Sequence, residues 1–144
     1  MESEINILLV EDHIPDQKLT QRAFQKGKLK IKLHIVNDGV ECMQFLLKQE
    51  NYEKAVTPHL ILLDLNMPRK DGREVLMEMK AHPELKQIPI IILTTSSDEK
   101  DIQDVYHLYG NAYIVKPVSF LKFAEAIQSI EDFWLGVTAL PKSK

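Results

Sequence analysis

Residues 60–68, Leu-Ile-Leu-Leu-Asp-Leu-Asn-Met-Pro, join an unbroken apolar run to an acidic residue at its carboxyl end. Consecutive aliphatic residues predict a strand that is buried on both faces, as the strands of parallel sheets are. Residues 7–10 and 90–93 are runs of the same kind, one earlier and one later in the chain. Three such runs indicate a parallel sheet with helices on both faces.

Segments with helical periodicity lie between the apolar runs. With two weaker runs included, the expected strands span residues 5–10, 32–36, 60–63, 88–93 and 111–115. A capping residue followed three positions later by glutamate predicts the start of a helix. Three such pairs occur: Asp38 with Glu41, Asp71 with Glu74, and Ser96 with Glu99. A first helix is expected over about residues 15–26, and an apolar stripe predicts a last one from Phe120 to Trp134.

This alternation of strands and helices predicts an α/β fold. Because parallel connections are right-handed, the arrangement expected at this size is a flavodoxin-like (βα)5 doubly wound sheet. Its five parallel strands would have the order 2-1-3-4-5. In a chain of 144 residues we expect one domain at 1–135, a C-terminal tail at 136–144 and no effector domain.

Composition limits the kinds of function. Apolar residues make up 44% of the chain and charged residues 27%, as in an ordinary soluble domain. A net charge of −3 argues against nucleic acid as the main partner. The single cysteine, Cys42, excludes an internal disulfide and a cysteine-based zinc site. The apolar runs are too short to span a membrane, and the N-terminus is unlike a signal peptide. We therefore expect a cytoplasmic protein without membrane contact.

Polar residues follow four of the expected strands, where ligands bind in folds of this kind. Glu11 and Asp12 follow the first strand, Asp64 the third, Thr94 the fourth and Lys116 the fifth. Two carboxylates about 4 Å apart repel by about 4 kcal/mol at an effective dielectric near 20. The ammonium group together with a divalent cation would balance the three negative charges. Hard oxygen ligands favour Mg²⁺ or Mn²⁺ and disfavour zinc.

Such a site suits phosphoryl transfer, in which positioning and charge neutralisation supply most of the catalysis. Asp64 is the best candidate for a nucleophile that forms an aspartyl phosphate, because the central strand delivers it to the middle of the edge. The metal ion would bridge Asp64 and Asp12. Lys116 and Thr94 would hold the phosphoryl oxygens from the other side.

Four stretches together resemble the receiver domain of two-component response regulators: residues 11–12, 64–72, 90–95 and 113–117. The intervals from Asp64 to Thr94 (30 residues) and from Asp64 to Lys116 (52 residues) are also similar to that family's. A narrower likeness is to the small response regulators of cyanobacterial phytochromes. It rests on residues 70–76, 88–96 and 133–141 and on the long loop near Tyr52.

The resemblance implies a phosphorelay protein whose Asp64 accepts a phosphoryl group from the phosphohistidine of a histidine kinase. The narrower likeness implies that this kinase is a cyanobacterial phytochrome. The implied Mg²⁺ ligands are Asp12, Asp64 and the backbone carbonyl of Asn66, with Glu11 often acting through water. The chain would then be a signalling receiver, not an enzyme with a separate substrate, although it catalyses its own phosphorylation and dephosphorylation.

The resemblance also assigns the switch. Thr94 and Tyr113 would be a switch pair that alters the surface of the fourth helix, fifth strand and fifth helix, and Lys116 would sense the phosphate. A cis peptide bond is expected before Pro117, since X–Pro bonds have only a small preference for trans. Thr95 stands where the family commonly has alanine or glycine, which puts ready access to the phosphoryl site in doubt.

Four alternatives compete with this interpretation. An aspartate-nucleophile phosphatase would place Asp-x-Asp after its first strand, where this chain has Glu11-Asp12. A flavin or nucleotide carrier would need a Ser/Thr/Gly-rich phosphate loop there, and acidic residues would repel its phosphate. A degenerate receiver that serves only for docking would lack some of the acidic residues or Lys116. A receiver in another histidine-kinase pathway would share all of these residues.

Apolar residues beyond the core stripe of the last helix predict a homodimer. They are Phe133, Leu135, Val137 and Leu140. Exposed apolar groups of this kind usually mark an interaction site, and a two-fold pair is the commonest outcome. The expected interface is the fourth-helix, fifth-strand and fifth-helix face together with the tail. The alternative is that the tail folds back onto its own domain.

Overall fold

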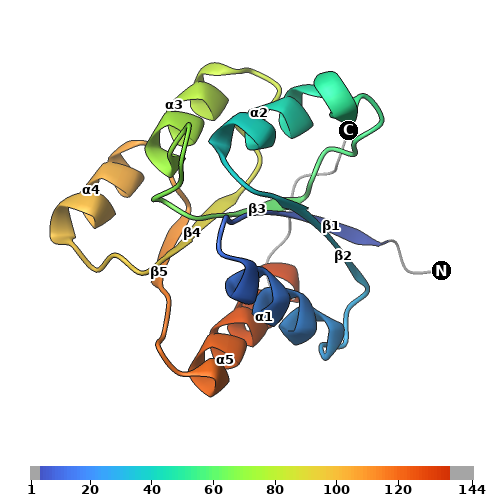
Figure 1. Cartoon of the computed structure of the whole chain (residues 1–144), viewed down its shortest axis with the longest axis vertical. Helices are drawn as coiled ribbons and strands as arrows, with labels where there is room; N and C mark the ends of the chain where they lie inside the picture. The colour runs from blue at the N-terminus through green and yellow to red at the C-terminus, as the bar shows by residue number, and fades with distance from the viewer. Residues whose placement is uncertain (1–3, 137–144) are drawn as a thin grey trace.

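The computed structural model, described here for residues 4–136, is a three-layer α/β fold (Figure 1). Its five strands are parallel in the order β2-β1-β3-β4-β5. They are β1 (Ile5–Val10), β2 (Ile31–Val36), β3 (Leu60–Leu63), β4 (Ile90–Thr94) and β5 (Ala112–Val115). The helices are α1 (Ile14–Gln25), α2 (Gly39–Leu47), α3 (Gly72–Ala81), α4 (Glu99–His107) and α5 (Phe120–Ile130). The predicted fold and strand order are confirmed.

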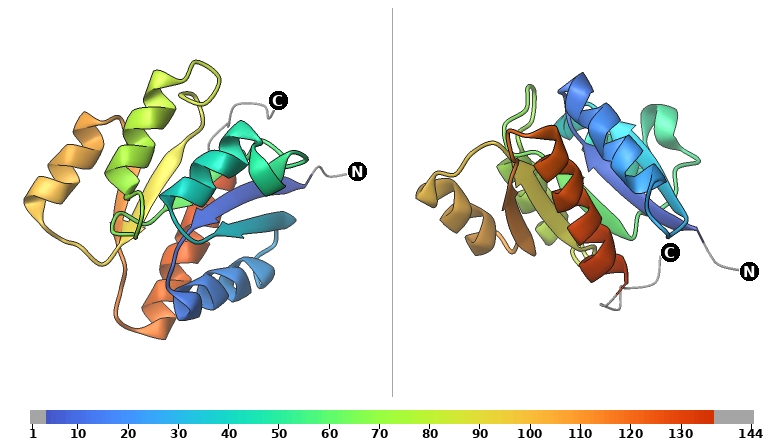
Figure 2. Two further views of the ribbon diagram at one scale, coloured as in Figure 1. Left: turned by 45° about the horizontal axis from the view of Figure 1, so that its top comes forward. Right: turned by 90° about the horizontal axis from the view of Figure 1, so that it is seen from below.

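Alternate residues of the central strands enter two separate cores. Leu8, Ile61 and Ile92 pack with α2, α3 and α4 on one face of the sheet. Leu9 and Leu62 pack with α1 and α5 on the other. Figures 1 and 2 show these two helical layers, with α1 and α5 side by side. This burial on both faces explains why the strand sequences are continuously apolar.

Two of the three predicted capping pairs are confirmed. The side chains of Asp38 and Asp71 accept hydrogen bonds from the backbone N–H groups of Glu41 (2.9 Å) and Glu74 (3.1 Å). The predicted capping pair of Ser96 and Glu99 is wrong. Asp98 caps α4 by accepting from the Lys100 N–H at 2.8 Å, and Ser96 lies outside the helix. The Ser96 hydroxyl forms a hydrogen bond with a side chain of α4 instead, which a local sequence pattern does not reveal.

Other differences occur at the ends of elements. The last helix ends at Ile130 and continues as one π-helical turn, η2 (Glu131–Leu135), where an unbroken helix was expected. A short 3₁₀ turn, η1 (Glu50–Tyr52), lies in the long loop. The expected cis bond before Pro117 is wrong, because no peptide bond among residues 4–136 is cis; trans remains the favoured form of most X–Pro bonds. No helix in this range has the length and apolarity for a membrane crossing.

The start of α2 fixes the loop between β3 and α3. The Gly39 N–H donates to the Lys70 carbonyl at 3.1 Å. The Arg69 Nε donates to the buried Asp38 carboxylate at 2.8 Å. Arg69 has a φ of 66°, in the left-handed region that costs non-glycine residues about 1–2 kcal/mol. The charged hydrogen bond to Asp38 offsets this cost and holds the loop in place.

Gly39→Ala is expected to destabilise the domain. The added Cβ would collide with the Lys70 carbonyl oxygen, so the helix or the loop must move. Overpacking costs about 1–3 kcal/mol, which exceeds the helix-propensity gain of alanine, about 1 kcal/mol. Urea denaturation should therefore show a lower free energy of unfolding. Gln44→Ala, a half-buried position of the same helix, is the control. A Gly39→Ala protein as stable as the wild type would contradict the tight contact.

Candidate functional site

Four strands bring the predicted site residues to one edge of the sheet. The Asp64 N–H donates to the Val10 carbonyl at 3.0 Å, so the residues that follow β1 and β3 are neighbours. The Lys116 N–H donates to the Thr94 carbonyl at 2.7 Å, which joins the ends of β4 and β5 in the same way. The backbone pairing of the sheet therefore assembles the site.

Three carboxylates form a cluster at this edge. One oxygen from each of Glu11, Asp12 and Asp64 lies within 4.8 Å of the other two. Glu11 is only 2% exposed, Asp64 is buried, and Asp12 is open to solvent. Asp12 therefore lies at the mouth of the cluster and Glu11 at its base. The geometry fits the sequence-based expectation for these three residues.

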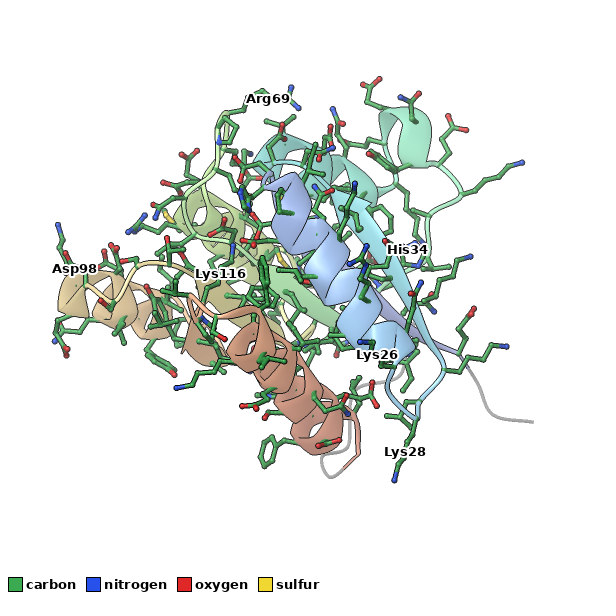
Figure 3. The ribbon with its side chains drawn as sticks, turned by 60° about the horizontal axis from the view of Figure 1, so that its bottom comes forward. Lys26, Lys28, His34, Arg69, Asp98 and Lys116 are labelled. Atoms are coloured by element: carbon green, nitrogen blue, oxygen red, sulfur yellow. The ribbon has the colours of Figure 1, made fainter. Side chains whose placement is uncertain are left out.

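The Lys116 ammonium lies among the carboxylates. Its Nζ forms an ion pair with Glu11 and lies 2.9 Å from Asp16 Oδ2 and 3.6 Å from Asp64 Oδ2. Figure 3 shows Lys116 in the interior of the molecule, in contrast to Arg69 at the outer tip of its loop. Asp16 was missed by sequence reasoning. Its position four residues after Asp12, in the first turn of α1, is the signal that could have revealed it.

Burial and charge shift the ionisation of this pair. Burial raises the pKa of Glu11 to about 7, against the hydrogen bond from Lys116, which lowers it. Burial lowers the pKa of Lys116, but the hydrogen bond to Glu11 and the charge of Asp64 outweigh it, so the net shift is upward. The ammonium thus stays charged and faces more acidic groups than it can neutralise.

The donor set fits a hard divalent cation. Carboxylate oxygens are the ligands that Mg²⁺ and Mn²⁺ prefer, and a doubly charged ion would balance the charge that Lys116 leaves. Glu11, Asp12 and Asp64 could hold such an ion. Asn66 lies exposed in the loop after β3, two residues beyond Asp64, within the segment that Asp38 and Gly39 hold.

Thr94 and Tyr113 both form hydrogen bonds with the backbone of Ser96. Thr94 is fully buried at the end of β4, and its Oγ1 is 3.5 Å from the Ser96 N–H. Tyr113 is half-buried on β5, and its hydroxyl donates to the Ser96 carbonyl at 2.8 Å. The two predicted switch residues are therefore joined through the β4–α4 loop. Sequence reasoning treated Ser96 only as a helix cap and missed this link.

A family model for the response regulator receiver domain matches residues 7–128. The chain belongs to the response regulator receiver family. It is 45% identical over 135 residues, 94% of this chain and 92% of the relative, to the response regulator Rcp1 of Synechocystis sp.. The predicted family and its narrower likeness to phytochrome response regulators are confirmed.

Two solved structures are similar over almost the whole receiver. The phosphorylated cyanobacterial phytochrome response regulator RcpA superposes with a TM-score of 0.94 at 42% identity, covering 97% of this chain and all of the other. The Mn²⁺-bound form of Rcp1 superposes with a TM-score of 0.92 at 44% identity, covering 96% and 99%. A relative of this receiver thus binds a divalent cation.

Asp12→Ala is expected to weaken Mg²⁺ binding by about tenfold or more, because the cation loses a charged oxygen ligand. Calorimetric titration of the receiver with magnesium chloride measures the effect. Asp132→Ala, which removes an exposed carboxylate beyond α5, is the matched control and should leave the affinity unchanged. An unaltered titration of Asp12→Ala would exclude Asp12 as a ligand.

Proposed function

We propose that the chain is a phosphoacceptor in a two-component phosphorelay, with Asp64 taking the phosphoryl group from the phosphohistidine of a histidine kinase. One observation carries the proposal. The Asp64 carboxylate lies at the end of central strand β3, among acidic groups and 3.6 Å from the Lys116 ammonium. A nucleophile, a cation for the developing charge and a candidate metal site thus share one edge.

In the proposed transfer, a carboxylate oxygen of Asp64 attacks phosphorus. The bond from phosphorus to the imidazole nitrogen breaks as the new P–O bond forms, and the imidazole leaves. Lys116 and Thr94 hold the phosphoryl oxygens. Asp12, Asp64 and the Asn66 carbonyl would hold Mg²⁺, with Glu11 acting through water, and Mn²⁺ could replace it. The bound ion would supply charge neutralisation.

The transfer makes the chain a signalling protein that acts on itself. The same groups would serve hydrolysis of the aspartyl phosphate, so no separate substrate is proposed. Phosphorylation would draw Thr94 toward the phosphoryl oxygens and favour Tyr113 in its inward position, changing the surface of α4, β5 and α5. A phosphoryl group adds negative charge at Asp64, which provides the attraction.

The proposed kinase is of the phytochrome type. The support is the similarity to Rcp1 and to the phytochrome response regulator RcpA over nearly the full receiver. Another histidine kinase is the alternative, and phosphotransfer from purified kinases would discriminate between them. We also propose a cytoplasmic location, which is consistent with a receiver that cannot form an internal disulfide because Cys42 is its one cysteine.

Asp64→Asn is expected to abolish phosphate incorporation, because an amide does not attack phosphorus. Labelling with acetyl phosphate in the presence of Mg²⁺, followed by intact-mass measurement, tests this. Asp71→Asn provides a matched control: Asp71 is also acidic and lies in the same loop region, but it caps α3. Labelling of Asp64→Asn at the wild-type level would refute the nucleophile assignment.

We also propose a homodimer that uses the α4-β5-α5 face. Large apolar side chains are exposed on and beyond these elements: Tyr106 on α4, Val115 on β5, and Phe120, Leu121 and Phe133. Trp134 and Leu135 instead pack against the α1–α5 core of their own domain. Val137 and Leu140 lie outside the described residues.

Tyr106→Glu should shift the receiver toward monomer, because it places a charge on a side chain that is 50% exposed in the proposed interface. Light scattering at tens of micromolar measures the mass, with and without beryllium fluoride as an acyl-phosphate mimic. Met77→Glu, on a 59% exposed position of α3, is the control. A chain ending at Gly136 tests the tail without disturbing Trp134. A wild-type protein that is monomeric in every condition would contradict the dimer.

A further inference from the structure

Arg73, in the first turn of α3, contacts three carboxylates and has no part in the site described above. Its guanidinium forms an ion pair with Asp101 of α4. It also lies 3.6 Å from Asp104 Oδ2 on α4 and 3.7 Å from Asp71 Oδ2 at the start of α3. The two helices lie side by side on one face of the sheet (Figure 1). The guanidinium thus bridges them.

Asp101 connects this bridge to the β4–α4 loop. Its second oxygen, Oδ2, accepts a hydrogen bond from the Ser96 hydroxyl at 2.6 Å. The hydrogen bond from Ser96 and the ion pair with Arg73 hold the pKa of Asp101 below its usual range, although partial burial opposes them. The Ser96 carbonyl in turn accepts from the Tyr113 hydroxyl. An ionised carboxylate is therefore held between Arg73 and the residue that anchors Tyr113.

The start of α3, which carries Arg73, lies against the backbone of Asp64, the proposed phosphoacceptor. Gly72, the residue before Arg73, donates its N–H to the Leu65 carbonyl at 2.8 Å. A Cβ on Gly72 would stand 2.7 Å from the Asp64 carbonyl oxygen. The backbone that carries Arg73 is therefore packed directly on the backbone of Asp64 and Leu65.

We propose that Arg73 is a positioning residue for the switch: through Asp101 it orients Ser96, and thereby the carbonyl that holds Tyr113 inward. This inference rests on the proposed switch of Thr94 and Tyr113. It adds a route from Asp64 to Tyr113 that does not pass through Thr94. Arginine suits the role because its planar group presents five donors in fixed directions, whereas a lysine ammonium is a compact point charge whose three donors rotate.

A simple ion pair between two helices is the competing explanation. Arg73 is 27% exposed, and pairs near the surface contribute little to stability, about 0–1 kcal/mol. Such a pair would change the unfolding midpoint slightly and leave the environment of Tyr113 unaltered. The test must therefore observe Tyr113 itself, and not stability alone.

The experiment compares Arg73→Met with wild type by aromatic NMR, with the Tyr113 ring assigned from Tyr113→Phe. In Arg73→Met the Tyr113 resonances should move toward those of an exposed tyrosine, before any ligand is added. The affinity for beryllium fluoride at saturating Mg²⁺ should fall by about fivefold or more, the usual scale of coupling between sites. Arg22→Met, an exposed arginine of α1, should match the wild type in both measurements.

Asp101→Asn keeps the side-chain shape and should reproduce the Tyr113 shift, and the double variant should add little to either single change. If one of the two variants is too unstable to study, the Tyr113 shift in the other still tests the inference. Unchanged Tyr113 resonances in both variants would overturn it. A wild-type receiver that binds no beryllium fluoride would instead refute the proposed function, since the Tyr113 measurement needs no ligand.

Discussion

The site depends on one buried ammonium group. Lys116 follows β5, yet its Nζ contacts carboxylates that follow β1 and β3 and one from α1. Without this cation, repulsion between neighbouring carboxylates, about 4 kcal/mol for a pair at 4 Å and an effective dielectric near 20, would push the ends of the strands apart. With it, the cluster stays compact but keeps an excess of negative charge, which is the condition for binding a divalent cation.

The surrounding contacts hold the loops around this cluster with little freedom. Asp38 and Gly39 at the start of α2 fix the loop that carries Asn66. Gly72 presses the start of α3 against the backbone of Asp64. On the side of β4, Ser96 joins Thr94, Tyr113 and α4 through hydrogen bonds. A change of charge at Asp64 would therefore meet a packed set of neighbours. In the proposed switch, its effect would be transmitted to the β4–α4 loop and β5.

Features with a local cause were predictable. The apolar strands were visible because burial on both faces demands unbroken aliphatic residues. The caps at Asp38 and Asp71 were visible because both partners lie within one helical turn. Ser96 shows where this reasoning fails: it has the local pattern of a cap, but its hydroxyl binds Asp101 while Asp98 caps the helix. The competing partner is a tertiary contact.

By itself, the sequence determined the order of strands and helices, the sheet edge where Glu11, Asp12, Asp64, Thr94 and Lys116 collect, and the family to which these residues belong. It could do so because parallel strands deliver whatever follows them to the same edge. Only the tertiary structure decided that Asp16 joins the ion pairs of Lys116, that Trp134 and Leu135 pack on the core, and that Arg73 bridges α3 to α4. Spacing could suggest Asp16, which lies four residues after Asp12, but each of these contacts depends on how side chains from separate helices and strands are oriented in space, and spacing alone does not fix that orientation.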